Sequence, residues 1–65
     1  MLEMECRLKD ILKDRGIKQT WLAERIGVRQ GTINEIVNGK RLPTLPVAYR
    51  IAKELGAHIE DIWRI

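Results

Sequence analysis

Hydrophobic residues recur at helical spacing along the chain, and glycines or prolines separate the periodic segments. This pattern predicts helices over about residues 6–15, 19–26, 30–37, 44–55 and 59–63. No strand-like alternation of apolar and polar residues is found. The sequence therefore predicts an all-α domain in which five short helices surround one core.

The second and third predicted helices are joined by a short turn that begins at Gly27. A glycine at this place allows the first helix to end and the chain to change direction sharply. Ile33 and Ile36 give the following helix a narrow apolar stripe, which leaves short polar side chains for its outer face. These are Gln30, Thr32, Asn34 and Glu35. The layout is typical of a helix-turn-helix that reads the DNA major groove.

The 65 residues suffice for one domain, residues 1–65, with residues 1–5 as a flexible arm. Cys6 is the single cysteine, so no intrachain disulfide can form, and no apolar run approaches the roughly 20 residues of a membrane span. We expect a soluble cytoplasmic protein with no membrane contact. With one histidine and no serine, the chain offers no usual catalytic or zinc-binding set. We therefore expect no enzymatic activity, no metal and no cofactor.

Positive charge is concentrated in one part of the chain. Residues 7–41 carry nine Lys/Arg and four Asp/Glu, whereas residues 42–65 carry three of each. The excess coincides with the predicted helix-turn-helix, as a surface that faces phosphates requires. Solvated helices can show the same excess by chance, so charge alone does not decide the function.

The chain resembles the helix-turn-helix family of lambda-type repressors, Cro proteins and small XRE-type bacterial regulators from Leu8 to Trp63. The residues that carry the resemblance are Gln19, Leu22-Ala23, Gly27-Val28, Ile33, Asn38-Gly39-Lys40, Pro43, Ile51-Ala52, Leu55-Gly56, Ile59 and Ile62. The resemblance implies a compact lambda repressor-like domain whose helix 30–37 enters the major groove of double-stranded DNA.

The resemblance also assigns roles to individual residues. Base contacts are implied for five residues: Gln30, Thr32, Glu35, Arg29 and Asn34. Glutamine can pair bidentately with adenine, and glutamate can accept a hydrogen bond from cytosine. Phosphate contacts are implied at the start of the second helix and in the loop after the third. The phosphate-contacting residues are Lys18, Gln19, Asn38, Lys40 and Arg41.

Two departures from the family pattern change the expected chemistry. Lys18 and Arg29 stand where relatives usually place a capping Ser or Thr, so capping is weaker and positive charge is gained. Leu12 and Val37 stand where the family often places an Arg–Glu ion pair. Apolar residues can replace such a pair without loss of stability. We therefore expect Leu12 and Val37 to be in contact.

The C-terminal residues Trp63 and Ile65 form an apolar patch with Ile62. We expect Ile59 and Ile62 to complete the core, and the terminal pair Trp63 and Ile65 to exceed what one small domain can cover. The family often dimerises through this region, so we expect a homodimer, a palindromic operator and repression of transcription. The alternative is an antitoxin-type module that binds a protein toxin and also regulates its own operon. RNA binding is less favoured, because aromatic residues are not interleaved with the basic ones. For Trp21 we expect a partly exposed indole, with a DNA or protein contact as the alternative.

Overall fold

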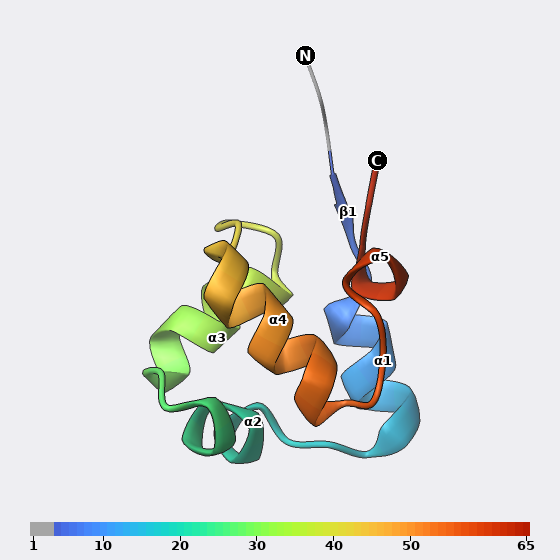
Figure 1. Ribbon diagram of the computed structural model, residues 1–65. Helices are drawn as coiled ribbons and strands as arrows, with labels where there is room; N and C mark the ends of the chain where they lie inside the picture. Colours follow the sequence, from blue (N-terminus) through green and yellow to red (C-terminus); the bar gives the residue numbers. More distant parts are fainter. Residues whose placement is uncertain (1–3) are drawn as a thin grey trace.

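The computed structural model describes residues 4–65, which form five helices and one two-stranded antiparallel sheet (Figure 1). The helices are α1 Leu8–Arg15, α2 Gln19–Ile26, α3 Gln30–Val37, α4 Leu45–Glu54 and α5 Ile59–Ile62. The strands are β1 Glu5–Cys6 and β2 Trp63–Arg64. The predicted five-helix architecture is confirmed. Among the described residues, no helix is both long enough and apolar enough to cross a membrane.

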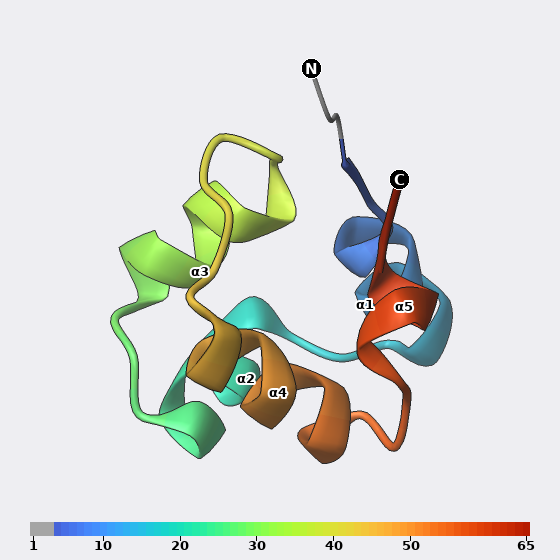
Figure 2. The same ribbon diagram turned by 45° about the horizontal axis from the view of Figure 1, so that its top comes forward.

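Helix α4 packs on α2 and α5, and α3 packs on α2 and α1. In the view of Figure 2, α4 lies between α3 on one side and α1 and α5 on the other. Every helix contributes buried aliphatic side chains to a single core. Leu8, Leu22, Ile33, Ile51 and Ile62 are fully buried, and each comes from a different helix. No polar or charged residue of the described chain is buried, so the fold depends on apolar packing.

The turn between α2 and α3 has the geometry that its sequence predicts. Gly27 has φ 76°, a left-handed conformation that side chains with a Cβ rarely adopt, and its N–H donates to the Ala23 carbonyl at 2.9 Å. Lys18 and Arg29 precede α2 and α3 in extended conformation, and neither side chain caps its helix. This confirms the expected loss of side-chain capping at both helix starts.

The two strands were not predicted. Glu5 pairs with Arg64 and Cys6 with Trp63, so Glu5 belongs to a sheet rather than to the expected arm. In the remainder of that arm, Met4 has no regular secondary structure, and residues 1–3 lie outside the described residues. Cys6 was expected to begin the first helix, but α1 begins at Leu8, and the Cys6 thiol donates to the Ile36 carbonyl at 3.4 Å. Strands of two residues are too short to show an alternating pattern.

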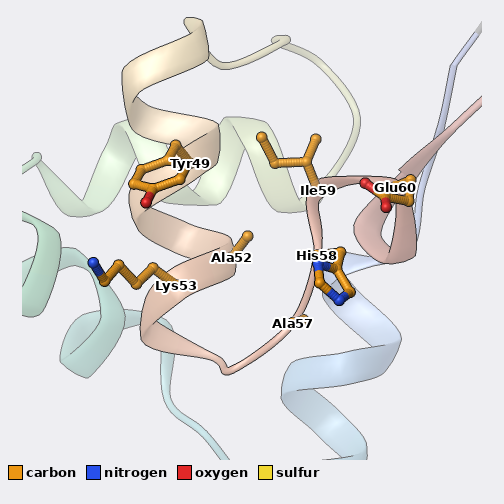
Figure 3. A pocket seen from close by; sticks show the side chains of 7 residues that line it. All are labelled: Tyr49, Ala52, Lys53, Ala57, His58, Ile59 and Glu60. Atoms are coloured by element: carbon orange, nitrogen blue, oxygen red, sulfur yellow. The ribbon is translucent and has the colours of Figure 1, made fainter.

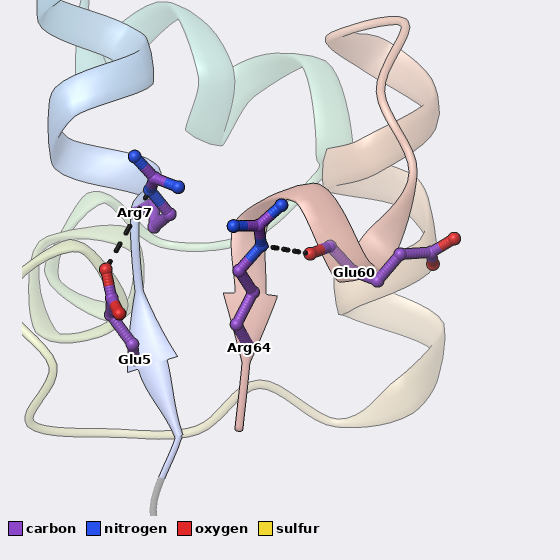
Figure 4. Close-up of polar contacts among 4 residues, drawn as sticks. All are labelled: Glu5, Arg7, Glu60 and Arg64. Carbon is purple, nitrogen blue, oxygen red and sulfur yellow. Dashed lines mark hydrogen bonds and ion pairs between the residues drawn. The ribbon is translucent and has the colours of Figure 1, made fainter.

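Polar contacts accompany the pairing of β1 with β2 (Figure 4). The Arg7 backbone N–H donates to the Ile62 carbonyl at 2.8 Å and continues the pairing of the strands. The Arg7 Nε lies 3.8 Å from the Glu5 carboxylate, and the Arg64 Nε donates to the Glu60 carbonyl at 3.2 Å. Both side-chain contacts are exposed, so their contribution to stability is small.

Arginine side chains connect the helices that support α3. The Arg15 guanidinium donates to the Leu55 carbonyl at the end of α4. The Arg25 Nε lies 2.6 Å from the Glu54 carboxylate and joins α2 to α4. The Arg25 guanidinium also lies 5.8 Å from the ring centre of Trp21, which is half-exposed, as expected for this indole.

Candidate nucleic-acid interface

Helix α3 has one buried and one open face. Ile33, Ile36 and Val37 are in the core, whereas Gln30 and Asn34 are exposed. Thr32 and Glu35 are partly exposed at the margins of the open face. The predicted reading helix therefore presents short polar side chains to the surface, and its apolar stripe packs into the core.

A chain of side-chain amides connects the start of α2 with the end of α3. The Asn34 Nδ2 donates to the Gln19 Oε1 at 3.3 Å, and the Asn38 Nδ2 donates to the Asn34 Oδ1 at 3.3 Å. Gln19 and Asn38, both predicted phosphate contacts, are thereby placed on either side of Asn34. This arrangement gives Asn34 a positioning role in the free protein, and its predicted base contact would require one of these bonds to change.

The loop after α3 places the Arg41 guanidinium beside the open face of α3. The Arg41 Nη2 lies 3.3 Å from the Glu35 Oε1, and both side chains are about half exposed. Glu35 was predicted to contact a base and Arg41 a phosphate. Their ion pair neutralises the one acidic group on the open face of α3 and holds Arg41 over the edge of that face.

The Glu35–Arg41 pair leads to a prediction for Glu35→Gln. Removing the anion releases Arg41 and should raise the affinity for duplexes of unrelated sequence several-fold at low salt, because the Glu35 carboxylate no longer repels the phosphates. Binding to duplexes of different sequence, measured over a salt series, checks this result. Glu60→Gln removes the same charge on α5 and serves as the control. If both variants bind alike, Glu35 does not face the DNA.

The remaining predicted residues are placed at both ends of the reading helix. Arg29 directly precedes α3, Lys18 directly precedes α2, and Lys40 follows the turn after α3; all three are exposed. The Lys40 backbone N–H donates to the Glu35 carbonyl at 2.9 Å, which ties this loop to the last turn of α3. The structure thus brings the predicted base and phosphate residues onto adjoining surfaces of α2, α3 and the following loop.

The predicted dimer residues need a correction. Ile62 is fully buried and Trp63 is 5% exposed, because β2 pairs with β1 and carries the Trp63 ring into the core. These two side chains therefore form no exposed apolar patch, and Ile65 alone is open, at 84%. Sequence reasoning assigned Trp63 to the surface because the strand pair that covers it has no sequence signature.

A surface cleft lies between α4 and α5, and no residue of α3 lines it (Figure 3). It has a volume of about 360 Å³ and is lined by Tyr49, Ala52, Lys53, Ala57, His58, Ile59 and Glu60. The His58 backbone N–H donates to the Asp61 carboxylate at 3.0 Å, so this residue begins α5 and has a structural role. The cleft shares no residue with the predicted reading face.

Taken together, the open polar face of α3, the left-handed turn at Gly27 and the supporting helices define a helix-turn-helix DNA-binding domain. A family model described as helix-turn-helix matches residues 8–62. The chain belongs to this family, that of the XRE-type, lambda repressor-like regulators.

Individual relatives agree with this assignment. A protein of Methanothermobacter thermautotrophicus called an uncharacterized HTH-type transcriptional regulator is 43% identical over 61 residues, covering 92% of this chain and 88% of its own. A regulator of the same description from Archaeoglobus fulgidus is 42% identical over 60 residues, with 92% and 84% covered. The antitoxin HigA-1 of Vibrio cholerae is 35% identical over 63 residues, and the match covers 83% of this chain and 59% of the antitoxin.

A solved structure supports the fold assignment. A Bacteroides fragilis protein for which DNA binding has been suggested superposes with a TM-score of 0.87 at 26% identity. The match covers 95% of this chain and the whole of that one. The chain is therefore a DNA-binding transcriptional regulator by family, and the residues that carry out recognition are open to direct test.

Proposed function

We propose that this protein is a sequence-specific repressor that inserts α3 into the major groove of a palindromic operator. The observation that carries the proposal is the open face of α3, where Gln30 is exposed at the start of the helix and Asn34 is hydrogen-bonded to Gln19 and Asn38. Gln30, Thr32 and Glu35 would contact bases, and Lys18, Gln19, Asn38, Lys40 and Arg41 would contact phosphates. A small domain bound over a promoter excludes polymerase by occupying its site, so repression in the cytoplasm is the simplest outcome.

We further propose that the protein binds its operator as a homodimer. Because Ile62 and Trp63 are internal, the candidate contact surface is instead a shallow apolar groove of about 220 Å³ between the loop before α4 and α5. Leu42 and Leu45 line this groove and are 63% and 73% exposed. Two exposed leucines in one groove favour burial of that groove against a second copy of the chain. Two-fold symmetry then implies half-sites about 34–36 Å apart, or a multiple of that spacing.

Selection of duplexes from a random pool at near-physiological salt tests the proposal. We expect enrichment of a two-fold symmetric sequence, with complexes that contain two protein chains per site in sedimentation measurements. Enrichment of an asymmetric site would contradict the dimer but not DNA reading. If no sequence is enriched and binding disappears at modest salt, the proposed recognition by α3 is wrong.

The second candidate is an antitoxin role, which the similarity to HigA-1 favours. In that role the same DNA-binding face would regulate an operon, and another surface would bind a toxin. The exposed groove at Leu42 and Leu45 is then an alternative contact for that partner. Growth rescue upon co-expression with the product of an adjacent small gene would distinguish the two roles.

A further inference from the structure

A second basic surface adjoins the reading face but belongs partly to α1, which the family resemblance did not implicate. It is an open cleft of about 490 Å³ between α1 and the first turns of α2 and α3. Its lining residues are Lys9, Leu12, Lys13, Ile17, Lys18, Gln19, Thr20, Gln30 and Val37. The lining therefore combines an apolar floor with a basic and amide-bearing rim, and it contains no acidic residue.

The positive charge of this cleft is not neutralised within the described part of the chain. Lys9 and Lys13 are four residues apart on α1 and therefore lie on the same side of the helix. Asp10 and Asp14 each follow one residue later, which turns them by about 100° around the helix. Neither lysine takes part in any ion pair among residues 4–65.

The start of α2 adds hydrogen-bond donors to the same cleft. Lys18 precedes the helix without capping it, and no acidic residue lies in the first turn. Within residues 4–65, the backbone N–H groups of Gln19 and Thr20 have no backbone acceptor outside the helix ladder. The first N–H groups of a helix lack partners inside the helix and carry partial positive charge, so they favour an anion. Lysine ammonium groups and free backbone donors thus meet in one cleft.

The occupant can be identified from what the cleft shares with α3. Gln30 lines the cleft and is also the first residue of the reading helix, so the two surfaces are continuous. If α3 lies in the major groove, the DNA strand that borders the groove would run along this cleft. The apolar floor suits the deoxyribose groups, and the lysines suit the phosphates between them.

We propose that this cleft binds the sugar-phosphate backbone beside each half-site, and that Lys9 and Lys13 extend the DNA contact from the helix-turn-helix onto α1. The inference rests on the proposed DNA-binding function and adds two phosphate-contacting residues to it. Both lysines are exposed, so they can be exchanged without disturbing the core.

The test measures the affinity of the full chain for its selected duplex over a salt series. Lys9→Gln and Lys13→Gln should each lower the slope of log affinity against log salt by about 0.9. Raising the salt from about 50 to about 200 mM weakens binding of every variant. For the Lys9→Gln, Lys13→Gln double variant, this loss of affinity should be about tenfold smaller than for the wild type. Lys53→Gln removes one lysine from α4, outside this cleft, and should leave the slope unchanged. The Lys9→Arg, Lys13→Arg double variant should keep the wild-type slope.

The outcomes separate this inference from the function on which it rests. If the wild type binds its duplex and both glutamine variants keep the wild-type slope, the DNA does not reach α1 and the inference is wrong. If the wild type binds no duplex, the proposed function fails and the inference fails with it. Amide spectra give a second criterion: the selected duplex should shift the Gln19 and Thr20 signals, whereas equal shifts with inorganic phosphate alone would indicate a free-anion site and overturn the inference.

Discussion

Replacing Val37 with glutamate is expected to remove a large part of the protein's stability at neutral pH. Val37 is 4% exposed on α3 and belongs to the same core cluster as Leu12 of α1, and both residues line the floor of the same cleft. An uncompensated carboxylate at a buried position costs about 3–5 kcal/mol, and the lysines at the rim of this cleft should offset only part of that cost. A chain of this length has a total stability of roughly 3–10 kcal/mol, so the loss is a large part of the whole.

Thermal and urea unfolding, followed by circular dichroism, check this expectation. Val37→Gln removes the apolar contact without adding charge, and the difference between the two variants isolates the cost of the carboxylate. Burial would raise the pKa of the introduced carboxyl above its unfolded value. The stability deficit relative to Val37→Gln is then largest at neutral pH and shrinks as the pH falls below the folded pKa. Equal stability of the two variants at neutral pH would mean that the position is not desolvated.

A double variant gives an independent criterion for the same site. Leu12→Arg combined with Val37→Glu installs the ion pair that is common in this family, and it should recover part of the stability that Val37→Glu loses. The recovery requires that α1 and α3 hold the two side chains in contact, and these helices do pack on each other. If the double variant is no more stable than Val37→Glu, the predicted contact between Leu12 and Val37 is wrong.

Gln30→Ala is expected to relax the choice of base at one position of each half-site. Gln30 is exposed at the start of α3, and a glutamine side chain can form a bidentate pair with adenine. One good bidentate pair discriminates against the wrong base by about 1–3 kcal/mol, which corresponds to roughly 5- to 150-fold in affinity. Binding to duplexes that carry each of the four bases at every operator position measures this discrimination.

Lys40→Ala is the matched control for that experiment. A phosphate contact carries no sequence information, so its loss should weaken binding to all duplexes alike and reduce the salt slope by about 1. Gln30→Ala should instead affect one position and leave the slope nearly unchanged. A uniform loss of affinity with Gln30→Ala would assign Gln30 to the phosphate backbone.

The sequence alone was sufficient to predict the helices and the helix-turn-helix. The spacing of Leu22, Ile26, Ile33 and Ile36 encodes which faces of α2 and α3 are buried, and Gly27 encodes the turn between them. These features depend on residues within a few positions of one another, and local periodicity records them directly. The open face of α3 follows from the same pattern, because the residues outside the apolar stripe must face outward.

The tertiary structure alone decided how the chain ends are arranged. Trp63 is internal because β2 meets β1, 57 residues earlier in the chain, and two-residue strands leave no periodic signal. The same holds for the Glu35–Arg41 ion pair and for the cleft where Lys9 and Lys13 meet Gln30. Such contacts depend on which distant elements pack together. Burial at the core positions is encoded locally, whereas these surface assemblies exist only after the core has placed the helices against one another.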